Sequence, residues 1–294
     1  MSLSTRTQGI SPSQSAGEGK AQRKNKYWAF YLFAIPFTII WLIPIFGAIS
    51  TALRSQDDIL YNGYLALPRP ITLASFVQAW IDGNVGGYLL NSFLITIPAL
   101  FGALFLSSLS AYALAHLRFR SSRLILMMFI TGMMLPFQII LLPVFQLSVA
   151  LGLYNNLLGV IAVHTAFQMG FCTFVLRNFM ISLPKEILES ARIDGCSEFG
   201  IYRRIVMPLT IPALAALTTL EFTWIFNDFI WSIVLFQDNN LRPVTAGLAT
   251  LIGQYNTQWN VVVAGSLLAC IPTLIVFIFL QRFFIQGLTL GSVK

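Results

Sequence analysis

Residues 124–176 read LILMMFITGMMLPFQIILLPVFQLSVALGLYNNLLGVIAVHTAFQMGFCTFVL and contain no Asp, Glu, Lys or Arg. A helix needs about 20 apolar residues to cross the roughly 30 Å hydrocarbon core of a bilayer. The segment is therefore too long for one membrane-spanning helix and has the length of two. Gly152 and the pair Asn155-Asn156 mark a turn between them. This stretch predicts a helical hairpin inside a membrane.

The composition of the whole chain leads to the same conclusion. Hydrophobic residues make up 56% of the 294 residues, charged residues only 10%, and the mean hydropathy is +0.75. A soluble domain carries about 25% charged residues, so a cytosolic enzyme, a secreted disulfide scaffold and a disordered protein are excluded. The segments do not alternate polar and apolar residues, which argues against a transmembrane barrel. We predict an all-α, polytopic membrane protein with six transmembrane helices near residues 28–50, 88–115, 124–148, 157–177, 209–236 and 261–284.

Basic residues predict the orientation of these helices. Fifteen of the 18 Lys and Arg residues lie in the N-terminal tail, at 116–123, at 177–208 and at the C-terminal end. Loops rich in Lys and Arg face the cytoplasm, so both termini and the loop 178–208 are predicted to be cytoplasmic. This asymmetry accounts for the net charge of +7. No basic stripe interleaved with aromatic residues supports a nucleic-acid partner.

The predicted organisation follows from these spans. The first residues are rich in Ser, Gly and Gln, a composition typical of disorder. The predicted segments are a disordered cytoplasmic tail at 1–26, a first transmembrane helix at 27–53, an extracytoplasmic loop at 54–86, a five-helix core at 87–285 that contains the loop 178–208, and a cytoplasmic C-terminal tail at 286–294.

The chain lacks the residue patterns of an enzyme. It contains no Gly-x-x-x-x-Gly-Lys-Ser/Thr motif, so it is not expected to bind ATP in the Walker manner. His116 and His164 are far apart, and a contact with a neighbouring helix is the favoured role of His164. The three cysteines show no metal or redox spacing. We predict no catalytic residue, no metal site and no cofactor.

The loop 178–208 is long for a helical connection and is the most informative part of the chain. Pro184 is typical of a helix start and Gly195 of a helix end. A second short helix is expected to begin with Ser197 as its cap and to end before Pro208. The loop is therefore predicted to be a helix–turn–helix that forms independently of the membrane.

One side of the first predicted helix is apolar. Ile187, Leu188 and Ala191 share that side, which suits a groove in another protein. The alternative is that basic residues of the loop hold it on the inner leaflet. Acidic residues in the same loop argue against simple attachment to anionic lipid: Glu186, Glu189, Asp194 and Glu198.

The same loop carries a resemblance to a known family. The run Glu189-Ser190-Ala191, three intervening residues, Gly195, nine intervening residues and Ile205-Val206-Met207-Pro208 resemble the signature E-A-A-x3-G-x9-I-x-L-P. That signature belongs to the inner-membrane permease subunits of binding-protein-dependent ABC importers, from which Ser190 and Met207 are mild departures. Further stretches resemble the carbohydrate-uptake branch and its MalG-like subfamily: Met134–Gln138, Trp224 with Asn227-Asp228-Phe229, and Gly287–Lys294. The resemblance covers essentially everything after the polar tail.

The resemblance implies a transport subunit and its partners. These are a sister permease, a dimer of separate ABC ATPase subunits, an extracytoplasmic solute-binding protein and a carbohydrate substrate, in a bacterial or archaeal cytoplasmic membrane. The extracytoplasmic loops 54–86 and 237–260 are expected to form part of the receptor for the binding protein. The first helix of the loop 178–208 is expected to sit in a cleft of the ATPase, with a hinge into the fifth span after it. The ATPase-coupling residues implied are Glu186, Glu189, Ser190, Ala191, Asp194, Gly195 and, at the hinge, Pro208.

Polar residues in the predicted spans indicate a substrate pathway. A carboxylate in a membrane helix costs about 2.5–3.5 kcal/mol on insertion scales and normally faces a cavity or a partner. Glu221 and Asp228 are seven residues apart, so they are expected on one face of the fifth span. Tryptophan can stack on a sugar ring, and amide or carboxylate oxygens can accept its hydroxyl hydrogens. The pathway candidates are Gln138, Trp224, Asn227 and Asp228.

Alternatives to this pathway remain open at this point. Bonding between helices is an equal alternative for Asn227 and Asp228 and the favoured role of Glu221. An alternative function is a secondary transporter in which Glu221 and Asp228 bind protons or sodium. That class is often built from inverted repeats, and no convincing internal repeat is seen.

Overall fold

The computed structural model describes residues 15–64, 66–253 and 257–290. All regular elements within these ranges are helical, which confirms the predicted all-α class for the described residues. The α-helices are α1 (Ser15–Ala52), α2 (Gln56–Asn62), α3 (Ala74–Ile81), α4 (Val85–His116), α5 (Ser122–Met134), α6 (Phe137–Ala150), α7 (Leu157–Ile181), α8 (Lys185–Ile193), α9 (Glu198–Ile201), α10 (Met207–Phe226), α11 (Ile230–Leu235), α12 (Val244–Leu248) and α13 (Trp259–Leu290). A π-helical turn, η1 (Tyr202–Val206), joins α9 to α10, and short 3-10 turns lie at η2 (Asn239–Leu241) and η3 (Ala249–Leu251).

Five helical segments are long and apolar enough to cross a membrane. They lie in α1, α4, α7, the continuous run from α9 through α10, and α13. Helices α5 and α6 together qualify as a sixth, but they meet at an angle of 103°. The prediction of one uninterrupted helix over 124–148 is therefore wrong. Leu135, which precedes Pro136, has ψ 127° because the residue before a proline avoids the helical conformation.

The fifth predicted span is also interrupted. Helix α10 ends at Phe226, and α11 begins only at Ile230, so 209–236 is not one helix. Asp228 lies in the break between them. The prediction that Glu221 and Asp228 share one helix face is wrong, because helical periodicity does not extend past Phe226.

The turn predicted between the third and fourth spans is confirmed. Helix α6 ends at Ala150 and α7 begins at Leu157. Gly152 has φ 69°, a left-handed conformation that glycine adopts without steric cost. The side chain of Asn156 accepts a hydrogen bond from the backbone N–H of Leu158 at 2.9 Å and so caps α7.

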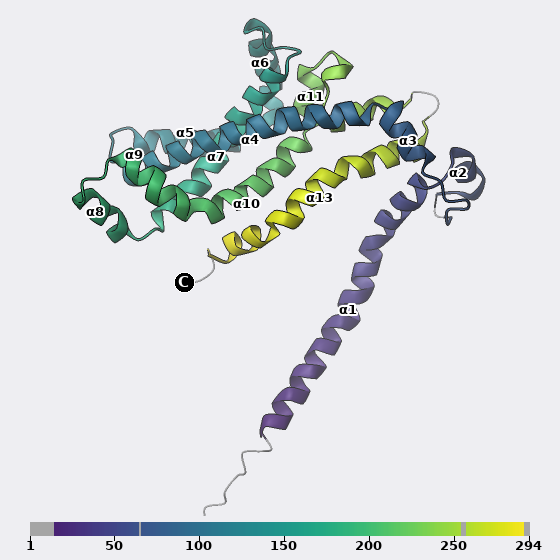
Figure 1. Ribbon diagram of the computed structural model, residues 1–294, viewed down its shortest axis with the longest axis horizontal. Helices are drawn as coiled ribbons and strands as arrows, with labels where there is room; N and C mark the ends of the chain where they lie inside the picture. The colour runs from purple at the N-terminus through teal and green to yellow at the C-terminus, as the bar shows by residue number, and fades with distance from the viewer. Residues whose placement is uncertain (1–14, 65, 254–256, 291–294) are drawn as a thin grey trace, which may run out of the picture.

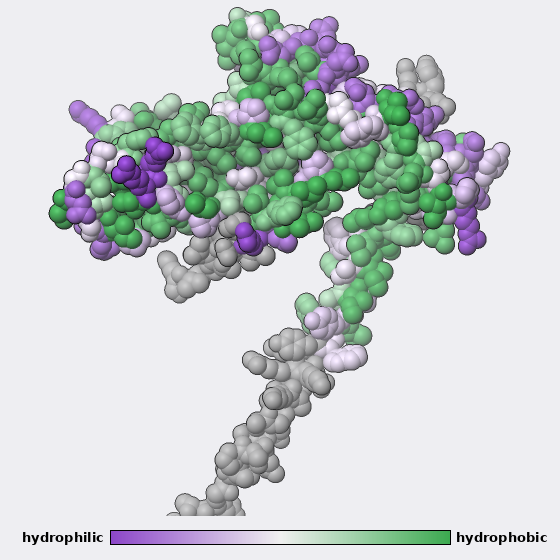
Figure 2. All heavy atoms as spheres, in the orientation of Figure 1, coloured by the Kyte–Doolittle hydropathy of each residue, from purple (hydrophilic) through white to green (hydrophobic). Residues whose placement is uncertain are grey.

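Helices α4, α7, α10 and α13 pack into an elongated bundle, and α1 leaves it at an angle (Figure 1). Near its C-terminal end α1 buries Ser50, Thr51 and Ala52. The long apolar part before that end is exposed, as in Trp41 (65%) and Phe46 (56%). Figure 2 shows hydrophobic residues over this helix and the middle of the bundle. Helix α1 therefore has an apolar surface that its own bundle does not cover.

The chain ends differ in part from the predicted segments. Helix α1 begins at Ser15, inside the predicted tail 1–26, where Ala, Gln, Arg and Lys are good helix formers. Residues 1–14 lie outside the described part of the chain. Helix α13 continues to Leu290, into the predicted tail 286–294, and residues 291–294 again lie outside it.

Two ends of the bundle carry polar structure. One end holds α8 and α9, and is called the α8–α9 end; the other holds α2 and α3, and is called the α2–α3 end (Figure 1). Hydrophilic residues gather at both ends in Figure 2. Helix α4 runs between the two ends, since it follows α3 directly and finishes near α9.

Candidate functional site

The loop at the α8–α9 end is a pair of capped helices. Helix α8 follows Pro184 and stops before Gly195, which has φ 79°. This left-handed conformation ends a helix at little cost only with glycine. The Oγ atom of Ser197 accepts a hydrogen bond from the N–H of Gly200 at 3.2 Å, so the predicted cap of the second helix is confirmed.

The apolar side of α8 packs against the chain's own bundle and is not free to dock into a partner. Leu188 (3% exposed) and Ala191 (6% exposed) are buried in the chain's own core with Ile201 and Tyr202. The apolar side predicted to dock thus faces the bundle, and the side chain of Ala191 does not face outward. The remaining predicted coupling residues of α8 and its turn are exposed: Glu186, Glu189, Ser190, Asp194 and Gly195.

An apolar surface nevertheless remains on the outer side of the loop. Ile193 is 86% exposed and Phe199 is 65% exposed, whereas Ile187 is 44% exposed. These side chains lie beside the exposed acidic residues of α8. The outer face therefore combines large apolar groups with carboxylates, a combination that protein interfaces use.

The second helix of the loop does not end before Pro208 as expected from the sequence. Helix α9, the π-helical turn η1 and α10 form one continuous helical run from Glu198 to Phe226. Pro208 lies directly after the π-helical turn and is exposed. Proline lacks a backbone N–H donor, and a wider turn before it accommodates the missing hydrogen bond. The helical run therefore continues past Pro208, with the π-helical turn just before it.

A carboxylate joins this loop to the bundle. Glu198 Oε2 accepts a hydrogen bond from Tyr112 Oη of α4 at 2.6 Å, and Glu198 Oε1 accepts one from Arg192 Nε of α8 at 2.8 Å. The hydrogen bond to Glu198 raises the pKa of Arg192. The guanidinium and carboxylate therefore form a charge-assisted pair, which is stronger than a neutral hydrogen bond.

A cavity of about 680 Å³ lies where the two helix breaks meet. It is lined by residues of α5, α6, α7, α10 and α11 and of the breaks between them: Gly132, Met133, Met134, Leu135, Pro136, Phe137, His164, Phe167, Gln168, Phe171, Trp224, Asn227, Asp228, Phe229, Ile230 and Trp231. Three predicted pathway residues, Trp224, Asn227 and Asp228, line it. Gln138 does not line it, but lies exposed on α6.

Asp228 has its hydrogen bonds within the chain. Its carboxylate accepts from the N–H of Trp231 (3.3 Å), the N–H of Ser232 (3.1 Å) and Ser232 Oγ (2.9 Å), so it caps α11. The Nε2 atom of His164 lies 3.6 Å from Asp228 Oδ2. The hydrogen bonds of the Asp228 carboxylate are therefore made to α11, and His164 of α7 lies close to it.

Asn227 and Trp224 are differently placed. Asn227 Nδ2 donates to the Thr223 carbonyl at 2.8 Å, and Asn227 is exposed. Trp224 is 69% exposed, with its ring at the wall of the cavity. Both side chains are therefore accessible to a molecule that enters the cavity.

His164 and Gln168 also line the cavity, although the sequence predicted only a helix contact for His164 and no role for Gln168. They lie on one face of α7, because residues four apart in a helix are neighbours. Gln168 is half-buried and makes no hydrogen bond to another residue in the part of the chain that the structure describes. The signal was present in the sequence as two large polar residues at i and i+4 in the middle of a charge-free helical segment.

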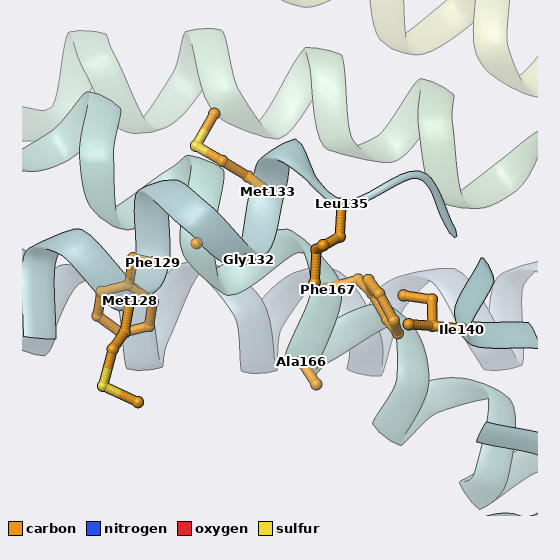
Figure 3. Close-up of a pocket in the computed structure, with 9 residues that line it drawn as sticks. Met128, Phe129, Gly132, Met133, Leu135, Ile140, Ala166 and Phe167 are labelled. Atoms are coloured by element: carbon orange, nitrogen blue, oxygen red, sulfur yellow. The ribbon is translucent and has the colours of Figure 1, made fainter. Parts of the chain in front are cut away.

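A smaller cavity of about 300 Å³ lies beside the first, on α5 and α7. Figure 3 shows that its lining side chains contain only carbon and sulfur atoms, among them Met128, Phe129 and Ala166. It shares Gly132, Met133, Leu135 and Phe167 with the larger cavity. The polar groups of the site therefore all lie on the larger cavity.

Glu221 has the role favoured for it from sequence. It is 2% exposed, and the Cys172 thiol donates a hydrogen bond to Glu221 Oε1 at 3.4 Å. The bond joins α10 to α7 inside the bundle. Glu221 does not line the larger cavity.

The α2–α3 end is organised by a buried arginine. Arg54 is fully buried, pairs with Asp58, and donates to the Gly63 carbonyl (2.7 Å) and the Asp58 carbonyl (2.8 Å). Hydrogen bonds from Arg54 and Asn62 hold the pKa of Asp58 below its usual range. The Arg54 carbonyl accepts from Ser75 Oγ of α3 at 3.2 Å. The hydrogen bonds of Arg54 thus hold α2 and α3 together.

An all-helical chain with several membrane-crossing helices, a structured helical loop at one end and a polar cavity between broken helices has the architecture of a membrane transport component. The chain belongs to the family described as the binding-protein-dependent transport system inner membrane component, which matches residues 103–289. This membership confirms that the chain is a permease component and not an enzyme. It also argues against the ion-coupled secondary transporter.

Several relatives are similar over nearly the whole chain. The arabinooligosaccharides transport system permease protein AraQ of Halalkalibacterium halodurans is 34% identical over 93% of this chain and 99% of its own length. The osmoprotective compounds uptake permease protein GgtD of Synechocystis sp. is 30% identical over 96% of this chain and 98% of its own length. A chain from the crystal structure of a bacterial ABC transporter that imports alginate has the same fold, with a TM-score of 0.78, 23% identity, and coverage of 95% of this chain and 100% of that one.

Proposed function

We propose that this chain is the permease subunit of an ATP-driven importer of a carbohydrate, and that it forms half of the translocation pathway. The observation that carries the proposal is the exposed outer face of α8, which presents Glu186, Glu189 and Ile193 on a helix held firmly by the bundle. A rigid loop of this kind can be gripped by a separate ATPase. The membership of a binding-protein-dependent family supports the assignment.

The proposed arrangement has six spans, with α5 and α6 together as the broken third one. Both termini and the α8–α9 end face the cytoplasm, and the α2–α3 end faces outward. The distribution of Lys and Arg supports this orientation. The proposed partners are an ATPase dimer at the α8–α9 end and a solute-binding protein at the α2–α3 end, in a bacterial or archaeal cytoplasmic membrane.

A sister permease is the proposed partner of the uncovered surfaces. Helix α1 exposes bulky apolar side chains along most of its length, and the larger cavity is open on the side of Trp224 and Asn227. Lipid can cover an apolar helix, but it cannot satisfy the polar groups of the cavity. A second permease facing this cavity would close the pathway.

A carbohydrate is the proposed substrate class. The larger cavity combines two amide side chains with aromatic rings: Asn227 and Gln168 with Phe137, Phe167, Phe171, Trp224, Phe229 and Trp231. Aromatic faces pack against the C–H groups of sugar rings, and amides bond to their hydroxyls. The name of the relative AraQ, an arabinooligosaccharide permease, supports this class.

The coupling assignment can be tested by charge reversal at Glu189. In an importer reconstituted with its ATPase and sister permease, Glu189→Lys and Gly195→Asp are expected to abolish uptake of radiolabelled arabinotriose and association of the ATPase, while membrane insertion persists. Asp57→Lys is the matched control for ATPase association, because Asp57 is an exposed acidic residue at the opposite end. Normal ATPase association in both loop variants would refute the assignment.

A further inference from the structure

Helix α4 links the two ends of the molecule by hydrogen bonds from its own side chains. At the α8–α9 end Tyr112 donates to Glu198 at 2.6 Å, and Ser108 Oγ lies 2.8 Å from Tyr202 Oη. The rings of Tyr112 and Tyr202 pack edge to face with centroids 5.4 Å apart. Because Glu198 also binds Arg192, one carboxylate holds α4, α8 and α9 together.

At its other end α4 holds the loop that precedes α12. Asn91 Nδ2 donates to the carbonyls of Asn240 (2.6 Å) and Arg242 (3.1 Å). Ser92 Oγ accepts from the N–H of Val244 at 2.9 Å. The segment 239–244 is therefore bound to α4 through three hydrogen bonds, all of which are made by backbone groups of the segment.

Helix α4 is also better suited than α10 to transmit movement along its axis. It is one continuous helix of 32 residues that passes through Pro98 without ending. Helix α10, in contrast, is preceded by the π-helical turn η1 and ends at the break after Phe226. A hydrogen-bonded helix resists changes in length, whereas a π-helical turn and an irregular break are places where a helical run deforms.

We propose that α4 carries movement of the α8–α9 loop to the segment 239–244, and that Glu198 is the positioning residue that fastens the loop to α4. The inference rests on the proposed function, because the ATPase supplies the movement. Coupling of this kind means that a change at one end shifts the conformational equilibrium at the other end. We assign this link to α4, because both ends contact it. Without the Glu198 contacts the loop still moves with α10, but the movement reaches 239–244 only weakly.

The test uses the assembled importer in lipid nanodiscs, with ATP and vanadate to trap the closed ATPase. Hydrogen–deuterium exchange of the segment 237–244 is measured with and without the trapped nucleotide. In the unchanged protein the exchange rate of this segment is expected to change on trapping. In Tyr112→Phe and Glu198→Gln that change is expected to shrink about fivefold or more, the lower end of typical coupling between sites. ATP hydrolysis and ATPase association are recorded in the same samples and are expected to persist.

A matched control separates coupling from general loosening of α4. Ser107 Oγ donates to the Met169 carbonyl of α7 at 3.1 Å and is buried. Ser107→Ala removes a hydrogen bond of α4 that does not reach the α8–α9 loop, and the nucleotide-dependent change is expected to remain.

The outcomes distinguish this inference from the proposed function. The inference is overturned if the change at 237–244 is absent from the unchanged protein with its ATPase bound, is unaffected in both variants, or is lost equally in Ser107→Ala. If the ATPase does not associate with the unchanged protein, the proposed function fails and the inference fails with it.

Discussion

The Nε2 atom of His164 on α7 lies 3.6 Å from Oδ2 of Asp228, in the break between α10 and α11. Both side chains are largely buried and both line the larger cavity. The pair brings a helix in the centre of the bundle close to the residue whose side chain caps α11. The two side chains lie together at the wall of the cavity, at the point where the helical run of α10 stops.

The capping role of Asp228 predicts a difference between two substitutions. Asp228→Ala removes the acceptor of three hydrogen bonds at the start of α11 and is expected to destabilise the chain by about 1 kcal/mol or more. Asp228→Asn keeps an acceptor oxygen and is expected to cost less. Thermal unfolding of the purified protein in detergent measures both. Equal destabilisation would mean that the charge facing His164, and not the cap, is the important contribution.

Gln168 is expected to contact the transported molecule. Gln168→Leu is expected to leave folding unchanged, because the side chain has no hydrogen bond to lose within the described chain. Loss of one hydrogen bond to a sugar, worth about 0.5–1.5 kcal/mol, would lower the apparent affinity for uptake about twofold to twelvefold. Uptake of an arabinooligosaccharide by the assembled importer provides the measurement.

Gln138→Leu is the matched control for Gln168. Gln138 is a glutamine of the same region of the chain, but it is exposed and does not line the cavity. Uptake is expected to be unchanged. A large loss in Gln138→Leu with none in Gln168→Leu would place the pathway along α6 instead of α7.

Ile193 is expected to be an anchor for the ATPase. Its side chain is 86% exposed on the outer side of the loop. Burial of an isoleucine contributes about 1.5–3 kcal/mol, so Ile193→Asp is expected to weaken ATPase association by an order of magnitude or more. Co-purification of the ATPase from detergent measures this. Leu60→Asp, at a residue of α2 that is 70% exposed, is expected to leave association intact.

Asp58 predicts a pH dependence of the α2–α3 end. The pKa of Asp58 is lowered in the folded protein by its hydrogen bond with Arg54, so the ionised form stabilises the fold. This stabilisation is present above the ordinary aspartate pKa of about 3.9 and is lost as the pH falls below it through the folded value. Proteolysis of residues 54–82 is expected to accelerate below about pH 4.

The pH dependence should disappear in Asp58→Asn, which cannot ionise. That variant is expected to be more sensitive to protease at neutral pH and to show little further change on acidification. A steep acid transition that persists in Asp58→Asn would assign the effect to another carboxylate.

The helical breaks show where sequence reasoning reached its limit. Pro136 was visible in the sequence, but the 103° bend between α5 and α6 depends on how α5 packs against α7 and α6 against α11. The face of α8 was predicted from helical spacing, which groups Leu188 and Ala191 correctly. Helical spacing does not say whether that face packs against the bundle or against a partner. In the structure the face lies in the core cluster with Ile201 and Tyr202.

The sequence by itself determined the membrane class, the positions of most helices and the capped loop between Pro184 and Ser197. These features depend on local properties: the length of charge-free segments, helix caps and the conformational freedom of Gly195. The tertiary structure alone decided that Asp228 meets His164, that Glu198 joins Arg192 to Tyr112, and that Gln138 lies outside the cavity. Such contacts join residues distant in the chain, and they depend on how helices rotate and cross when they pack, which spacing along one helix does not specify.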